Sequence, residues 1–390
     1  MSSYHSEPQT LAQLPIPGEQ ETEHSQALIG VILADIERQG GVVSFCDYMR
    51  MALYQPGLGY YSAGSTKFGA SGDFVTAPEI SPLFGRTLAR QCEALFAQGC
   101  RRQILEFGAG SGRLCAQIVG SLDAGVSYYI LEISADLRSR QQSLLKQALT
   151  QAQYECIEWL SELPFQFDGI VLGNELLDAM PVHIVLKNEG WRELGIGFDG
   201  SRFEWRVYAE HSEAVKMIQK IESVVGDLPE GYCTEVNLNY LPWLNALQAC
   251  CNRAVILLID YGYEQHQYYH PERHTGSLIC HFRHRAHPDP LVYPGLQDIT
   301  AFVDFDAFAD AALESGFSLC GLVSQGQFLL ANGLLEALDS PGQGENTLAQ
   351  LECAQQIKTL TLPAEMGEKF KVIGLQKNLN LEIPALSRSR

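Results

Sequence analysis

Short apolar runs alternate along the chain with segments whose apolar residues recur every three or four positions. The first complete unit has an apolar run, a glycine turn and a helical pattern in which Leu114, Ile118 and Leu122 share one face. Strands that alternate with helices form a parallel sheet with helices on both faces. The pattern therefore predicts an α/β fold with a doubly wound, mostly parallel sheet. The predicted strands are 104–107, 128–132, 154–159, 167–172 and 254–259, with an antiparallel closing pair at 317–323 and 370–376.

The regions outside these strands break the alternation. Residues 1–25 are polar and show no period, which predicts a disordered tail. Residues 26–100 contain helical patterns followed by a long glycine-rich loop. The region 101–390 is predicted to be the sheet domain, and an insertion at about 183–252 has the pattern of a β-meander followed by two helices.

A glycine-rich turn follows the first predicted strand. Gly108, Gly110 and Gly112 allow a sharp turn and a close approach by a ligand, and the next helix begins with unpaired N–H groups. A dinucleotide turn has the spacing Gly-x-Gly-x-x-Gly, but Arg113 stands at the position of its third glycine. Glu106 lies two residues before the first glycine. The turn predicts a nucleotide-type binding site; the structural alternative is a glycine turn without a ligand.

The second predicted strand ends in an acidic residue, Glu132, twenty residues after Gly112. A carboxylate there can accept hydrogen bonds from both hydroxyls of a ribose, and charge-assisted bonds contribute roughly 1.5–3 kcal/mol each. In open α/β sheets, ligands bind at the carboxyl ends of the strands. Glu132 therefore favours a bound ligand over an empty turn.

Polar residues also follow the fourth and fifth predicted strands. The fourth leads into Asn174, Glu175 and Asp178, and the fifth ends in Asp260 and Tyr261. On a helical turn, two acids three residues apart would share a face, and paired carboxylates suit a guanidinium group. The alternative is a helix start in which the helix dipole favours an acid.

The glycine-rich loop and its flanks carry aromatic and acidic residues: Tyr60, Tyr61, Asp73, Phe74 and Glu79. Loops of this length are functional or disordered, and the aromatic residues argue against disorder. We predict a lid or a substrate-binding wall, with an inert connector as the alternative, and we count Asp260 and Tyr261 among the candidates for substrate binding. For the tyrosines and the phenylalanine, packing is a more common role than catalysis.

Composition narrows the classes of partner and the location. The formal net charge is −19 without a basic stripe, which argues against nucleic-acid binding. The eleven cysteines are scattered, which is typical of free thiols. The sequence has no spacing typical of a zinc site, so we predict no metal. The apolar run at 254–259 is too short to cross a membrane. No Lys or Arg precedes Arg38, which opposes a leader peptide and predicts a cytoplasmic protein.

Several motifs, taken together, resemble one known family, the MidA-type family of class I S-adenosyl-L-methionine (SAM) methyltransferases. Its mitochondrial members are protein arginine methyltransferases that act in complex I assembly. The motifs are at 59–61, 72–74, 78–85, 106–112, 174–179, 259–263 and 366–372.

The resemblance implies a Rossmann-like class I methyltransferase sheet, SAM as cofactor and an arginine side chain of a protein as methyl acceptor. Asn174, Glu175 and Asp178 would be the catalytic residues. The residues implied to bind SAM are Glu106, Gly108, Gly110, Gly112, Glu132 and Asn174.

Other functions stay open at this point. The chain could be a SAM-binding assembly factor or scaffold without essential catalysis, or a methyltransferase of small molecules. The glycine spacing disfavours a nicotinamide-dependent oxidoreductase. The insertion at about 183–252 is a candidate for a partner-docking surface or a homodimer interface.

Overall fold

The computed structural model describes residues 14–63, 76–336 and 347–387. Its internal contacts divide the chain into two compact units, which we describe separately. The units interleave along the chain, so neither coincides with one of the predicted domain ranges. The meander unit contains Met1–Phe74, Asp178–Tyr240 and Tyr263–Asp304, and the sheet unit contains Val75–Leu177, Leu241–Gly262 and Phe305–Arg390.

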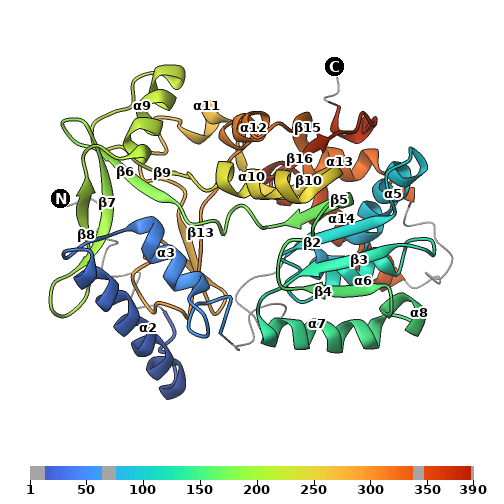
Figure 1. Cartoon of the computed structure of the whole chain (residues 1–390), viewed down its shortest axis with the longest axis horizontal. Coiled ribbons are helices and arrows are strands. Elements are labelled where there is room, and N and C mark those ends of the chain that lie inside the picture. Colours follow the sequence, from blue (N-terminus) through green and yellow to red (C-terminus); the bar gives the residue numbers. More distant parts are fainter. Residues whose placement is uncertain (1–13, 64–75, 337–346, 388–390) are drawn as a thin grey trace. The chain divides into compact units, whose positions relative to one another are not determined.

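The sheet unit is built on a mostly parallel sheet (Figure 1). In spatial order its strands are β15 (Ser318–Ser324), β16 (Phe370–Lys377), β10 (Cys251–Tyr263), β5 (Phe167–Asn174), β2 (Gln103–Phe107), β3 (Ser127–Leu131) and β4 (Ile157–Leu160). From β10 to β4 all neighbours are parallel, whereas β16 runs antiparallel to both β10 and β15. This confirms the predicted class I methyltransferase sheet, including its antiparallel C-terminal strand.

Helices cover both faces of this sheet because its strands are apolar on both sides. On one face, Leu88, Ile118 and Phe328 belong to the same core as Ile104 and Leu172. On the other face, a chain of aromatic rings runs from β2 to α10 and on to α12. The helices of this unit are α4 (Ala77–Ile80), α5 (Pro82–Ala97), α6 (Arg113–Val119), α7 (Ala135–Ala148), α8 (Gln151–Tyr154), α10 (Tyr240–Cys250), α12 (Phe305–Glu314), α13 (Gln325–Ala331), α14 (Thr347–Thr361), α15 (Met366–Lys369) and the 3₁₀ helix η2 (Pro384–Leu386).

The two strands that carry the candidate site approach each other closely at Gly169. This residue of β5 has φ of 150°, and a Cβ atom built on it would overlap the backbone carbonyl of Gln103 in β2. Glycine is therefore required at this point of the sheet.

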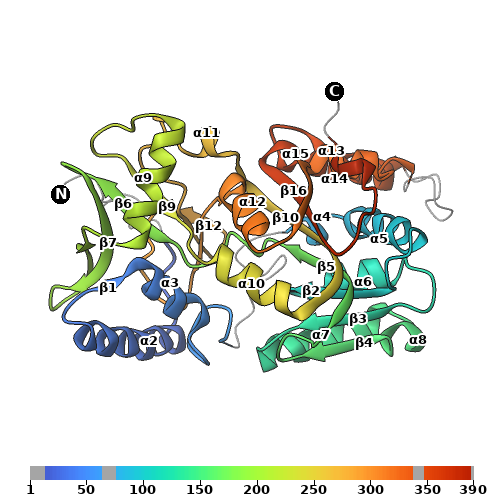
Figure 2. The ribbon, with the colours of Figure 1, turned by 45° about the horizontal axis from the view of Figure 1, so that its top comes forward.

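The meander unit is organised around an antiparallel sheet with the order β1-β7-β6-β9, and β8 pairs with β7. Leu28, Ile32 and Tyr48 of α2 and α3 cover one face of the sheet, and Ile218 of α9 covers the other. Figure 2 shows α2 and α3 next to each other in this unit. The elements are α2 (Glu19–Arg38), β1 (Val43–Ser44), α3 (Phe45–Tyr54), β6 (His183–Lys187), β7 (Trp191–Phe198), β8 (Phe203–Ala209), α9 (Glu213–Val225), β9 (Cys233–Val236), α11 (Gln265–Tyr268), β11 (Ile279–Phe282), β12 (Arg285–His287), β13 (Asp298–Thr300) and β14 (Val303–Asp304).

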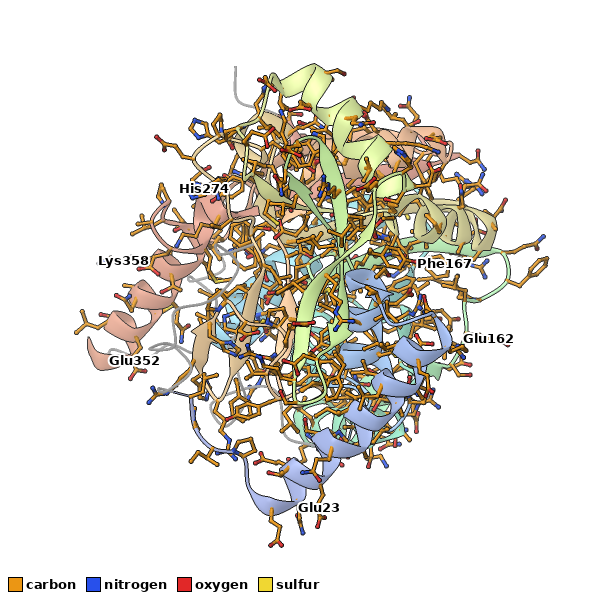
Figure 3. The ribbon with its side chains drawn as sticks, turned by 90° about the vertical axis from the view of Figure 1, so that its left-hand side faces the viewer. Glu23, Glu162, Phe167, His274, Glu352 and Lys358 are labelled. Atoms are coloured by element: carbon orange, nitrogen blue, oxygen red, sulfur yellow. The ribbon has the colours of Figure 1, made fainter. Side chains whose placement is uncertain are left out.

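The first helix begins earlier than the sequence pattern suggested. We predicted disorder for residues 1–25, but α2 starts at Glu19. The backbone N–H of Gly18 donates to Glu21 Oε2 at 2.6 Å, and acids in the first turn suit the helix dipole. Glu23 is exposed and points away from this helix (Figure 3). Polar residues thus formed the start of a helix, which apolar periodicity alone could not reveal.

A buried ion pair links two strands of the meander sheet. His183 Nδ1 of β6 lies 2.7 Å from Glu193 Oε1 of β7, and their side chains are 19% and 2% exposed. Burial opposes a charge on the ring, but hydrogen bonds to Cys46 and Glu193 and the adjacent carboxylate outweigh it and raise the pKa of His183 to about 9. The ring is therefore charged at neutral pH in the folded protein.

This pair predicts a pH dependence of stability. A histidine pKa near 6.5 in the unfolded chain and about 9 in the folded protein gives a contribution that is complete below pH 6.5 and is lost as the pH rises through 9. The full shift corresponds to about 3 kcal/mol, and Cys46 contributes to it beside Glu193, so we expect the difference in unfolding free energy between wild type and Glu193→Gln to shrink by about 1–2 kcal/mol over this range. Urea unfolding from pH 6 to 9.5 measures it, and a difference that does not change with pH would contradict the assignment.

Candidate functional site

Four strands of the sheet unit end at the same edge. The parallel registers place Phe107 opposite Leu131 and Gly173, and Asn174 opposite Ile259. Ligands of open α/β sheets bind at this edge, where the strand order reverses between β2 and β5. The structure thus brings together four predicted groups that are distant in sequence. Each group begins at the residue directly after Phe107, Leu131, Asn174 or Ile259. These residues are Gly108, Glu132, Glu175 and Asp260.

The glycine turn after β2 requires its three glycines. Gly108, Gly110 and Gly112 have φ values of 63°, 53° and 88°, a region that other residues rarely adopt. A Cβ atom at Gly112 would also lie 3.4 Å from Cγ of Gln141. The turn is therefore narrow and has no side chain at three positions. A turn that binds a ligand through its backbone needs this shape.

Glu106 lies in the core behind this turn. It is buried, and its Oε2 accepts a hydrogen bond from the Tyr128 hydroxyl at 2.8 Å. Burial raises the pKa of Glu106 to about 7, although the bond from Tyr128 acts in the opposite direction. The bond from Tyr128 joins β2 to β3 inside the sheet. Direct contact with a cofactor stays a prediction.

Glu132 is held at the end of β3 by two hydrogen bonds. Its Oε1 accepts from the backbone N–H of Ser134 at 2.8 Å, and its Oε2 accepts from Gln141 Nε2 at 3.2 Å. Burial raises the pKa of this carboxyl group, while the bonds from Ser134 and Gln141 and the charge of Arg138 lower it. The next residue, Ile133, is an apolar side chain that is 77% exposed. We missed Ile133, although its place directly after the acid was visible in the sequence.

The segment after β5 is not the helical turn that we predicted. Glu175 has a φ of 52°, and none of residues 174–178 is helical. The cause is Asp260, a buried residue of β10, whose Oδ2 accepts the backbone N–H groups of Leu176 at 3.0 Å and Leu177 at 2.7 Å. These bonds replace the bonds of a helix, so Glu175 and Asp178 do not share a helical face.

Asn174 and Tyr261 flank this turn in the sheet unit. Asn174 Nδ2 donates to Glu175 Oε1 at 3.1 Å, whereas Asn174 Oδ1 is buried and has no hydrogen-bond partner within the described residues. The backbone N–H of Tyr261 donates to Asp260 Oδ1 at 2.9 Å, and its ring packs against Phe370. Asp260 therefore orders both strand ends, a role that the sequence did not reveal.

Glu79 contacts the glycine turn directly. The Ser111 hydroxyl donates to Glu79 Oε1 at 2.6 Å, and Glu79 forms an ion pair with Arg113. The structure thus places this predicted lid residue beside the turn in the sheet unit. Asp73 and Phe74 lie outside the described residues.

The other predicted residues belong to the meander unit. Tyr60 is buried in its core, and the Tyr61 hydroxyl donates to Asp298 Oδ1 at 2.8 Å. Burial raises the pKa of Tyr61 well above its usual range, and the nearby Asp298 and Asp178 raise it further. The backbone carbonyl of Asp178 accepts from Ala301 at 3.0 Å. For these tyrosines the structure shows packing roles, and substrate binding stays a prediction.

All eleven cysteines are free, as predicted. Among residues 14–63, 76–336 and 347–387, no group of three or more His, Cys, Asp or Glu side chains could hold a metal ion. No helix of this described part is long and apolar enough to cross a membrane.

A family model described as "Putative S-adenosyl-L-methionine-dependent methyltransferase" matches residues 83–323, which is more than half of the chain. The chain belongs to this family. It is a class I SAM-dependent methyltransferase, and SAM is its cofactor. The family resemblance and the fold inferred from the sequence are confirmed.

Individual relatives of this methyltransferase agree. "Protein arginine methyltransferase NDUFAF7 homolog, mitochondrial" of Drosophila melanogaster is 30% identical over 86% of this chain and 82% of that protein. "Protein arginine methyltransferase NDUFAF7, mitochondrial" of Danio rerio is 28% identical over 87% of this chain and 85% of that protein. A crystal structure from Burkholderia thailandensis, bound to S-adenosyl-homocysteine, has 41% identity and a TM-score of 0.89, covering 96% of this chain and 98% of that one.

The same relatives correct one prediction. The curated relatives are named as mitochondrial proteins, which contradicts the cytoplasmic location that we predicted. That prediction was based on the lack of basic residues before Arg38. Such a lack says nothing about the chemistry of the folded protein and was a poor guide to location.

Proposed function

We propose that this methyltransferase transfers a methyl group to the guanidinium group of a protein arginine. The observation that carries the proposal is the acidic turn after β5. The turn bears the Glu175 carboxylate, and its Leu176 side chain reaches the glycine turn, because a Cβ atom at Gly108 would lie 3.6 Å from Leu176 Cδ1. A carboxylate beside the cofactor turn suits a cationic acceptor. The names of the relatives, protein arginine methyltransferases, support the same acceptor.

The residues at this edge fit SAM. Glu132 offers a carboxylate for the ribose hydroxyls, and the exposed Ile133 beside it offers an apolar surface for a base. The buried Asn174 Oδ1, which lacks a partner within the described residues, calls for a hydrogen-bond donor, and the ammonium group of SAM is one. We assign the glycine turn to the remaining backbone contacts.

When bound, SAM supplies a methyl group on a sulfonium that is already activated. The protein then has to orient the acceptor and take up a proton, because methylation of a guanidinium nitrogen displaces one. We assign both tasks to Glu175, whose carboxylate can bind the guanidinium and accept that proton. Alignment of well-oriented groups can contribute about 7–11 kcal/mol to such a reaction. The catalytic role predicted for Asp178 stays a prediction.

The relatives' names and the insertion also suggest the kind of substrate and a surface that binds partners. A protein substrate is consistent with the relatives' names, and the family resemblance adds a link to complex I assembly. The insertion at about 183–252 is proposed as a docking surface for a partner protein or as a homodimer interface. Both assignments rest on the resemblance and on the position of the insertion.

The test is a methylation assay with SAM that carries a labelled methyl group and a protein extract as acceptor. We expect label in methylarginine after hydrolysis. Glu175→Gln should lower the rate at least ~100-fold, because it removes the proton acceptor, while SAM binds with nearly unchanged affinity. Label in another residue or in small molecules would refute the arginine assignment. SAM binding without any transfer would favour the scaffold function.

A further inference from the structure

A buried amide connects three segments around the cofactor edge. Gln141 of α7 is fully buried. Its Nε2 donates to the backbone carbonyl of Gly110 at 3.1 Å and to Glu132 Oε2 at 3.2 Å, and its Oε1 accepts from Trp159 Nε1 at 2.9 Å. One side chain thus binds the glycine turn, the end of β3 and the strand β4.

The chemistry of the partners fixes the orientation of this amide. The indole N–H of Trp159 can only donate, whereas the Gly110 carbonyl and the ionised Glu132 carboxylate can only accept. The amide oxygen must therefore face Trp159, and the NH₂ group must face the other two. In this orientation both N–H groups and the oxygen of Gln141 are used, and a flipped amide would lose all three bonds.

Gln141 also packs against the glycine turn. A Cβ atom at Gly112 would lie 3.4–3.5 Å from the Cγ, Cα and Cβ atoms of Gln141. Gln141 therefore lies beside Gly112 and holds the turn by its hydrogen bond at Gly110. At the same time it restrains the carboxylate of Glu132, so the turn and the acid keep a fixed separation.

We propose that Gln141 is a positioning residue for SAM, which fixes the glycine turn and the Glu132 carboxylate in their binding geometry before the cofactor arrives. The proposal rests on the assignment of these two groups to SAM under the proposed function. A site that is already ordered loses less conformational freedom when its ligand binds, so its affinity is higher. The backbone carbonyl of Gly110 and one oxygen of Glu132 are bonded to Gln141, and the remaining lone pairs of the carboxylate stay available for hydroxyl groups.

The first experiment is calorimetric titration with SAM of Gln141→Met, which keeps the volume of the side chain and removes its three hydrogen bonds. We expect binding ~10- to 100-fold weaker than in the wild type. The matched control is Gln147→Met, an exposed glutamine on the same helix, for which we expect unchanged affinity. An affinity of Gln141→Met within twofold of the wild type would overturn the proposal.

A mutant cycle separates positioning from a general loss of structure. If Gln141 acts partly through Glu132 and partly through the glycine turn, the double variant Gln141→Met with Glu132→Gln should bind SAM more weakly than Glu132→Gln alone, but by less than the loss that Gln141→Met causes in the wild type. Additive losses would overturn the proposal. If Glu132→Gln itself binds SAM like the wild type, the assignment of Glu132 to SAM fails instead, and the two failures are thereby distinguished.

The pH dependence of SAM binding is a further test, because a purely structural role of Gln141 would leave it unchanged. The groups that lower the pKa of Glu132 are the Ser134 amide, Gln141, the nearby guanidinium of Arg138 and the Ile133 amide. Loss of the Gln141 bond should therefore shift the acidic fall in SAM affinity to higher pH, and an unshifted profile would overturn the proposal. If Gln141→Met does not fold, Trp159→Phe removes the indole N–H together with part of the ring and leaves the Gln141 amide in place. We expect it to bind SAM ~3-fold more weakly, and unchanged binding would again overturn the proposal.

Discussion

Replacement of Asp260 by alanine is expected to abolish methyl transfer and to lower the free energy of unfolding by about 3–5 kcal/mol. The buried carboxylate of Asp260 accepts three backbone N–H groups, from Leu176, Leu177 and Tyr261, at 2.7–3.0 Å. Hydrogen bonds to a charged group contribute about 1.5–3 kcal/mol each, and loss of the acceptor leaves buried donors unsatisfied. The turn that holds Glu175 in its left-handed conformation would then have no anchor.

The measurement combines urea unfolding with the methylation assay. Asp168→Asn is a matched control, because Asp168 lies at the opposite end of β5, and we expect it to change the unfolding free energy by less than ~1 kcal/mol. Asp260→Asn keeps the size of the side chain but turns one acceptor oxygen into a donor, so we expect it to be nearly as damaging as alanine. If Asp260→Ala folds and methylates at the wild-type rate, the turn does not depend on this carboxylate.

The sheet and its cofactor edge could be predicted because their signals are local. The glycine turn, the acids that end the strands and the apolar strands themselves each lie within a few residues of one another. The cap of α3 is of the same kind, because the Ser44 hydroxyl oxygen accepts from the N–H of Asp47 only three residues away. The parallel order of the strands then follows from the alternation of strands and helices.

The turn at Glu175 could not be predicted, because its determinant lies far away in the chain. The acids at 175 and 178 have the spacing of a helical face, and the bonds that prevent a helix come from Asp260 on another strand. Gln141 gave no signal for the same reason: its three partners lie on separate segments. Hydrogen bonds between distant parts of the chain determine both the turn at Glu175 and the position of Gln141. The spacing of neighbouring residues gives no information about such bonds.

Strands in the 264–300 region were missed for a different reason. The apolar pattern predicted no strand there, but the order β12-β11-β13 forms a small antiparallel sheet. These strands are only three or four residues long, and histidines and arginines are interspersed in them. Short runs of this composition carry no alternation of apolar and polar positions, so tertiary contacts decide their structure.

Glu132→Ala is expected to weaken the binding of SAM by at least ~100-fold, the largest loss of affinity that we predict for a single cofactor contact. The proposed role of this carboxylate is to accept hydrogen bonds from both ribose hydroxyls, and two charge-assisted bonds of roughly 1.5–3 kcal/mol each correspond to that factor or more. The bonds from Ser134 and Gln141 already orient the group, so it binds without further ordering. Glu132→Gln should lose less, because one oxygen acceptor remains.

Calorimetric titration with SAM measures this effect, and Glu158→Ala on the neighbouring β4 is the matched control, because its side chain is exposed. Since burial raises the pKa of Glu132, protonation should weaken SAM binding at a higher pH than an ordinary glutamate would suggest, and Glu132→Ala should remove this dependence. An affinity of Glu132→Ala within threefold of the wild type would exclude this carboxylate from the ribose site. In that case the cofactor would be held by the glycine turn and Asn174, and the further role assigned to Gln141 would fall with it.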